Sequence, residues 1–129
     1  MRMMGLDIGH KHIGVALTDQ NNKMAYPEGV FCHDSQIRDT IKKIIQEKNI
    51  GKIVVGIPFS LKGEIGHQAQ KVFDFIHETL EGLGPEIVHY DERFTSKIPK
   101  MQNRGKKMKE VDKYSACILL NDYISHHEK

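Results

Sequence analysis

The chain has 129 residues, of which 39% are hydrophobic and 28% charged, and its formal net charge is +2. This length and composition predict a single soluble globular domain spanning residues 1–129. The apolar runs are far shorter than the about 20 residues that cross a bilayer, and the N-terminal segment lacks the apolar stretch of a secretion signal. Cys32 and Cys117 form no CxxC pair, which argues against a zinc site or a disulfide framework. We therefore expect a cytoplasmic protein with no membrane partner.

The first third of the chain has the pattern of three strands. Met3–Ile8 is a short apolar run suited to a buried strand, and Gly9–His12 follows as a turn. Apolar residues then alternate with small or polar ones over His12–Thr18, which is typical of a second strand. Two such runs around a glycine-containing turn predict a hairpin. A third strand is expected over Ala25–Phe31, at a sheet edge because Pro27 cannot donate a ladder hydrogen bond.

Helices and strands alternate after this hairpin. Asp34 and Ser35 supply an N-cap for a first helix, which Asn49 and Gly51 end. Lys52–Gly56 is a compact fourth strand. The apolar faces of the first two helices have helical spacing and are expected to consist of Ile37, Ile41, Ile44 and Ile45 in one, and Val72, Phe73, Ile76, Leu80 and Leu83 in the other.

The last elements predicted are a strand and a helix. Gly82 and Gly84 close the second helix, and Glu86–Tyr90 is the fifth strand. A final helix is expected over Val111–Ser125, and its inward residues are predicted to be Tyr114, Cys117, Ile118 and Ile124. Helix–strand alternation implies parallel strands joined by right-handed crossovers, with helices on both faces. The sequence therefore predicts an α/β protein with a five-stranded mixed sheet of order 3-2-1-4-5, the pattern of a ribonuclease H-like fold.

Three carboxylates, Asp7, Glu92 and Asp112, lie at positions that are typical of functional sites. Asp7 interrupts the apolar run of a predicted central strand, where a charge is costly unless it is balanced. Glu92 lies at the carboxyl end of the fifth strand, where ligands of open α/β sheets collect. Asp112 begins the last helix. Each has a purely structural alternative: a hydrogen-bonded buried Asp, a solvated charge cluster and a favourable helix-dipole contact.

The three acids together indicate a magnesium site. Magnesium prefers oxygen ligands and keeps several waters, so that few carboxylates suffice. Such ions can stabilise the attacking and leaving oxygens of a phosphodiester displacement. The sequence has no His/Cys cluster for a softer metal, no GxSxG nucleophile and no P-loop.

A basic block separates the second acid from the third. It contains seven cations and no acid, namely Arg93, Lys97, Lys100, Arg104, Lys106, Lys107 and Lys109. A block of one sign indicates an interaction surface or a solubilising loop. We expect it to contact phosphates, because such contacts position nucleic acid without reading its sequence.

Four segments resemble the YqgF/RuvX family of bacterial ribonuclease H-like proteins, and their order and spacing agree over nearly the whole chain. They are GLDIGHKHIGVA (5–16), IVVGIPFSLKGEIG (53–66), YDERFTS (90–96) and VDKYSACILLNDYI (111–124). The family is described as nucleases of pre-ribosomal RNA and also as Holliday junction resolvases. The turn GHKHIG departs from the family in carrying His10 and His12, whose contact with substrate stays open.

The resemblance implies a metal-dependent nuclease that processes the 5′ end of pre-16S ribosomal RNA. Asp7, Glu92 and Asp112 would be its catalytic acids and its Mg²⁺ or Mn²⁺ ligands. Gln68 would lie near the site, at the start of the second helix, and Lys11 is the expected basic neighbour of Asp7. The partner would be nucleic acid, with a ribosomal RNA precursor ahead of branched DNA, and the protein would be a monomer or a homodimer.

Three other functions compete with this one. A junction-resolving DNA endonuclease would use the same acids. A non-catalytic RNA-binding factor is disfavoured because all three acids are present. An actin-like phosphotransferase is suggested because GLDIGHKHIGVA also resembles the phosphate-binding hairpin of sugar kinases and actin-like ATPases. Such proteins need two related domains around the nucleotide, however, and 129 residues supply one.

The basic block gives a first prediction. Changing Lys106, Lys107 and Lys109 together to Ala should weaken nucleic-acid binding and flatten the slope of log affinity against log salt by roughly two to three, since each phosphate contact contributes about 0.7 to 0.9. The cleavage rate of the saturated complex should change little, because the acids remain. An unchanged salt slope with a collapsed saturated rate would instead assign the block to the catalytic apparatus.

Overall fold

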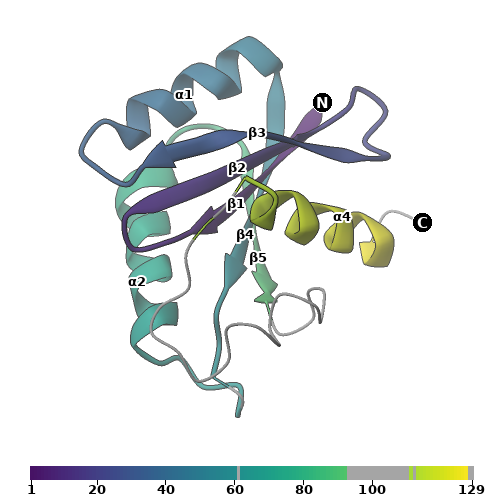
Figure 1. The fold of residues 1–129 in the computed structure, drawn as a ribbon. Coiled ribbons are helices and arrows are strands. Elements are labelled where there is room, and N and C mark those ends of the chain that lie inside the picture. Colours follow the sequence, from purple (N-terminus) through teal and green to yellow (C-terminus); the bar gives the residue numbers. More distant parts are fainter. Residues whose placement is uncertain (61, 93–110, 112, 128–129) are drawn as a thin grey trace.

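The computed structural model describes residues 1–60, 62–92, 111 and 113–127, and its centre is a five-stranded mixed sheet (Figure 1). The strand order is β3-β2-β1-β4-β5, as the sequence predicts. β2 and β4 are rich in β-branched residues such as Ile and Val, which favour a pleated surface. The strands are β1 (Arg2–Ile8), β2 (His12–Thr18), β3 (Ala25–Cys32), β4 (Ile50–Ile57) and β5 (Glu86–Asp91).

The sheet pairing places β1 at the centre. β1 is antiparallel to β2, with Asp7 opposite Gly14, and parallel to β4, with Leu6 opposite Val55. β4 and β5 are also parallel, so β1, β4 and β5 present their carboxyl ends at one edge of the sheet. β3 is an edge strand that contains Pro27, as predicted.

One face of the sheet is covered by α1 (Ile37–Lys48), α2 (His67–Phe75) and a π-helical turn (Ile76–Leu80) that continues α2 (Figure 1). The buried side chains of this layer come from both helices and pack on β1, β2 and β4. The four predicted isoleucines of α1 are all buried. In the second helical segment Val72, Ile76 and Leu80 are buried, while Phe73 and Leu83 are partly buried.

The ends of α1 differ partly from the prediction. Asn49 ends the helix in a left-handed conformation with φ of 57°, as expected, whereas Gly51 already belongs to β4. The helix begins only at Ile37, after Gln36, which makes no side-chain cap. Asp34 instead accepts a hydrogen bond from the Gln36 backbone N–H at 3.0 Å. The polar pair therefore forms a turn before the helix, because the Asp34 carboxylate reaches its own local backbone first.

The opposite face is covered by α4 (Ser115–His127), and here the predicted inward residues are only partly right. Tyr114 is 53% exposed, Ile118 is half-buried, and Cys117 and Ile124 only flank the core. The residues that pack inward are Ala116, Leu119, Leu120 and Tyr123. The segment around them is apolar on nearly all sides, so helical periodicity alone did not select the buried face.

Gly5 selects that face. A Cβ atom at Gly5 would lie 2.9 Å from the Leu120 Cβ and 3.2 Å from the Ala116 carbonyl oxygen. The absent side chain lets α4 lie directly on β1, with Ala116 and Leu120 at the contact.

Among the described residues, no helix is long and apolar enough to span a bilayer.

This contact gives a second prediction. Gly5→Val should lower the free energy of unfolding by about 2 kcal/mol or more, because the new side chain overpacks a backbone contact that cannot yield. Gly66→Ala is the control: a Cβ atom there meets nothing within 4 Å, so the change should stay within about 0.5 kcal/mol. Urea denaturation of both variants measures the difference, and equal stabilities would contradict the packing described.

Candidate nuclease site

Asp7 is a buried carboxylate on the central strand, with 1% of its surface exposed. Its side chain lies on the same face as Gly5, which contacts α4, because alternate residues of a strand share a face. Its neighbours across the sheet are Gly14 on β2 and, one position beyond the Leu6–Val55 pair, Gly56 on β4. Both neighbours lack a side chain, so space is left around the Asp7 carboxylate on this face.

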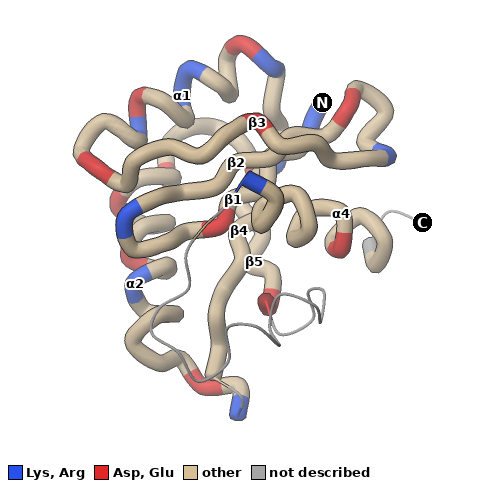
Figure 2. The backbone as a smooth tube through the Cα atoms, viewed as in Figure 1, with Lys and Arg blue, Asp and Glu red and all other residues tan. Residues whose placement is uncertain are grey.

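Glu92 fills part of that space. It directly follows β5, whose residue Tyr90 pairs with Gly56. A Cβ atom at Gly56 would lie 2.6 Å from the Glu92 Oε2 and 2.8 Å from its Cγ, so the Glu92 side chain lies over the glycine. Neighbouring strands are only about 4.8 Å apart. The structure therefore brings the carboxylates of Asp7 and Glu92 to the same face at the carboxyl ends of β1 and β5; Figure 2 shows acidic positions at these strand ends.

The chain that precedes α4 approaches the same place. A Cβ atom at Gly9, two residues after Asp7, would lie 2.4 Å from the Val111 Cγ2. Val111 is thus packed against the end of β1. The third predicted acid, Asp112, lies outside the described residues. So do Arg93, Lys97, Arg104, Lys106, Lys107 and Lys109.

A pocket of about 80 Å³ adjoins Glu92, next to the carboxyl end of β1. Gln68, which the resemblance placed near the site, is the second residue of α2 and lines this pocket together with Glu92. Lys11 is exposed at the tip of the β1–β2 turn and is not part of the pocket wall. The lining residues are Ile8, Gly9, His10, His33, Pro58, Gln68, Lys71, Val72 and Glu92.

Sequence analysis missed two polar residues of this pocket, His33 and Lys71, and left the role of His10 open. His33 follows β3 and reaches the pocket only because β3 returns along the hairpin. Its Nδ1 lies 2.8 Å from the Gly9 carbonyl oxygen, and its ring meets Phe75 edge-on at 5.2 Å. No local sequence pattern marks such a residue, whereas Lys71 could have been found at helical spacing from Gln68.

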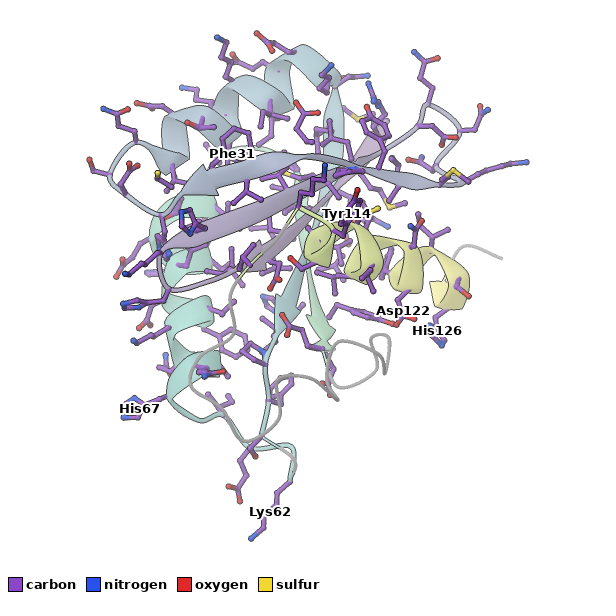
Figure 3. The ribbon with its side chains drawn as sticks, in the orientation of Figure 1. Phe31, Lys62, His67, Tyr114, Asp122 and His126 are labelled. Atoms are coloured by element: carbon purple, nitrogen blue, oxygen red, sulfur yellow. The ribbon has the colours of Figure 1, made fainter. Side chains whose placement is uncertain are left out.

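A polar contact ties β5 to α4 just before Glu92. The Tyr90 hydroxyl donates a hydrogen bond to the Asp122 carboxylate at 2.7 Å, and the His126 Nδ1 lies 3.3 Å from the same hydroxyl. Figure 3 shows Asp122 and His126 together on α4. Burial, and then the Asp122 carboxylate, raise the pKa of Tyr90 above its usual range. This contact holds the end of β5, and therefore the start of the Glu92 segment, against α4.

The mixed sheet of order β3-β2-β1-β4-β5 with helices on both faces defines a class, the proteins of ribonuclease H-like fold. The structure of Thermus thermophilus RuvC in complex with a Holliday junction has the same fold, with a TM-score of 0.66 at 13% identity, covering 99% of this chain and 95% of that one. A second T. thermophilus RuvC structure gives 0.63 at 13% identity, with the same coverage.

Sequence comparison identifies the family. A family model described as "RuvX: Holliday junction resolvase" matches residues 1–126, and the chain belongs to this RuvX family of nucleases. A relative from Desulforudis audaxviator is 38% identical over 133 residues, covering 97% of this chain and 94% of the relative. One from a Sulfurihydrogenibium strain is 39% identical over 130 residues, covering 95% and 89%. Both are named "Putative pre-16S rRNA nuclease". The resemblance inferred from the four segments is therefore confirmed.

The Tyr90 contact gives a third prediction. Tyr90→Phe should lower the free energy of unfolding at neutral pH by about 1.5 to 3 kcal/mol, since a hydrogen bond to a carboxylate is lost. The folded-state pKa of Tyr90 is raised, so its contribution is complete below the unfolded value near 10 and is lost as pH rises through the folded value. The stability gap between wild type and variant should therefore shrink above pH about 10. Denaturant titrations at several pH values measure this gap, with Tyr114→Phe, at an exposed ring, as the control; a gap independent of pH would contradict the assignment.

Proposed function

We propose that this protein is a divalent-metal-dependent nuclease whose substrate is the precursor of 16S ribosomal RNA. The observation that carries the proposal is the placement of Asp7 and Glu92 on one face, around glycines, at the carboxyl ends of β1 and β5, the two parallel strands on either side of β4. That placement brings two hard oxygen donors together at the carboxyl ends of the strands, where ligands of α/β sheets bind.

The residues present fit a magnesium or manganese ion. Gly14 and Gly56 leave room beside Asp7 that side chains would otherwise fill, and the donors on this face are carboxylates, not thiols or imidazoles. Among the described residues, no three His, Cys, Asp or Glu side chains converge as a metal site. A third ligand would therefore come from elsewhere in the chain, and we assign that role to Asp112, the residue after Val111.

The protein's contribution to the reaction is to hold these carboxylates in fixed positions. A bound divalent ion would supply the positive charge that stabilises the attacking and leaving oxygens of the phosphodiester. Asp7 is held by the central strand and shielded from bulk water, while Glu92 is held by β5 and its Tyr90 contact to α4. Gln68 would contact the substrate from α2 and Lys11 from the tip of the β1–β2 turn. The basic block would bind flanking phosphates.

The choice of substrate follows the relatives. Proteins 38% and 39% identical to this chain over nearly their full lengths are named for pre-16S ribosomal RNA. The family description names Holliday junctions instead, so a junction-resolving DNA endonuclease is the second candidate. A fold serves many substrates, so the decision rests on a cleavage comparison.

A cleavage panel gives the fourth prediction. Wild-type protein with magnesium should cut a 16S ribosomal RNA precursor and should be inactive in chelator. Asp7→Asn keeps the shape of the side chain but removes its charge, and should lower the cleavage rate at least about a hundredfold while leaving binding nearly unchanged. Asp39→Asn, at an exposed position of α1, is the matched control and should behave as wild type.

The panel also contains a four-way DNA junction, an RNA–DNA hybrid and single strands. If the protein cut only the four-way junction, the substrate would be branched DNA and not a ribosomal RNA precursor. Cleavage that persists in chelator would contradict the metal mechanism. RNA binding without cleavage of any substrate would leave a binding factor, and turnover of ATP would revive the phosphotransferase.

A further inference from the structure

We propose that the pocket between the β1–β2 turn and α2 binds one unpaired nucleobase of the substrate, next to the phosphodiester that is cut. Gln68 would hydrogen-bond to the edge of that base without selecting its identity. The inference rests on the proposed nuclease function and specifies its substrate: the strand must be single, or opened, at the point of cleavage.

The position of the pocket carries the first part of the argument. Glu92 contributes to the pocket wall, and its carboxylate also lies over Gly56 beside Asp7. Ile8 and Gly9, the two residues that follow Asp7, form another part of the wall. The pocket and the acid site therefore share a side chain and a strand end. A nucleotide with its phosphate at the acids has its neighbouring base within reach of the pocket.

The lining chemistry carries the second part. Ile8, Pro58 and Val72 provide apolar surface, whereas the exposed Gln68 and Lys71 lie on α2 at the polar side. An apolar surface does not hold a phosphate well, but it does accept the face of a base. The Gln68 amide has both a donor and an acceptor, which match the edge of an unpaired base.

The volume argues for a single ring system. About 80 Å³ gives room for a few waters or one base in a pocket that is partly open to solvent. A base pair in a duplex has its edges engaged and both faces stacked, so it cannot enter. An unpaired base in RNA, or a base turned out of a helix, can.

The pocket wall is held in place before a ligand arrives. The His33 backbone N–H donates to the Lys11 carbonyl at 2.9 Å, and the His33 Nδ1 contacts the Gly9 carbonyl at 2.8 Å. The same ring packs edge-on against Phe75 of α2. His33 thus fixes the β1–β2 turn relative to α2, and a preformed pocket loses less entropy on binding.

The test is a scan with abasic nucleotides. The probe is a fluorescein-labelled RNA in which a duplex carries a short single strand, and each single-stranded position is replaced in turn by an abasic nucleotide. Binding is measured by anisotropy in chelator, so that no strand is cut. We expect one position at which loss of the base weakens wild-type binding by roughly tenfold, with little effect elsewhere.

Gln68→Ala should bind the intact strand about tenfold more weakly and should no longer distinguish it from the abasic strand at that position. Gln70→Ala is the matched control: it lies on the same helix outside the pocket wall, hydrogen-bonded to Asp74 at 3.0 Å, and should keep the full difference. Gln68 is exposed, so its replacement should fold normally, and thermal unfolding verifies this.

Three outcomes would overturn the inference. One is an abasic scan in which no single position weakens binding more than the others. Another is a Gln68→Ala variant that still binds the intact strand more tightly than the abasic strand. The third is equal weakening of every strand by Lys71→Ala without any abasic effect, which would make the pocket a phosphate site. Because the scan is done in chelator, its result is independent of the cleavage panel, so that failure of the base pocket and failure of the nuclease assignment are separate results.

Discussion

The burial of the Asp7 carboxylate in the middle of the sheet is the constraint on which the site depends. Taking an ionised carboxylate out of water costs several kcal/mol unless positive charge or hydrogen bonds compensate it. Such a position is poor for stability alone, and an apolar residue would suit the central strand better. Gly14 and Gly56 add to that cost, because glycine inside a strand packs poorly. A cation held beside Asp7, which we propose for this site, would offset that cost by attraction to the carboxylate.

Glycines also allow α4 and the residue Val111 before it to pack closely against β1. Gly5 admits the helix onto β1, and Gly9 admits Val111 against the strand's end. Gly5 and Asp7 share one face of β1 and Gly9 directly follows the strand, so helix packing and site geometry are set at the same strand end. The Tyr90–Asp122 hydrogen bond then fixes β5 against the helix from the other side. The packing of α4 and the placement of Glu92 therefore share these contacts.

Local pattern predicted the sheet well, because alternation and strand-ending glycines are local signals. The hairpin, the strand order and the central position of Asp7 all followed from them. The buried face of α4 did not, since Ile118, Leu119 and Leu120 offer apolar side chains in every direction and the deciding contact, Gly5, lies over a hundred residues earlier. His33 was missed for a similar reason: its partners Gly9 and Phe75 meet it only in three dimensions.

In the proposed function, the shared position of Glu92 connects the cleavage site with the base pocket. A carboxylate that both faces the acid site and lines the base pocket makes the two occupants adjacent, and repels a phosphate from the pocket itself. Binding energy gained from a base in the pocket then orients the neighbouring phosphodiester at the acids, and does not merely tighten the complex. Selectivity of this kind requires no reading of base identity. It discriminates by pairing state, because only a strand that can release a base gains the orienting contact, and a fully paired duplex bound by its phosphates alone lacks it.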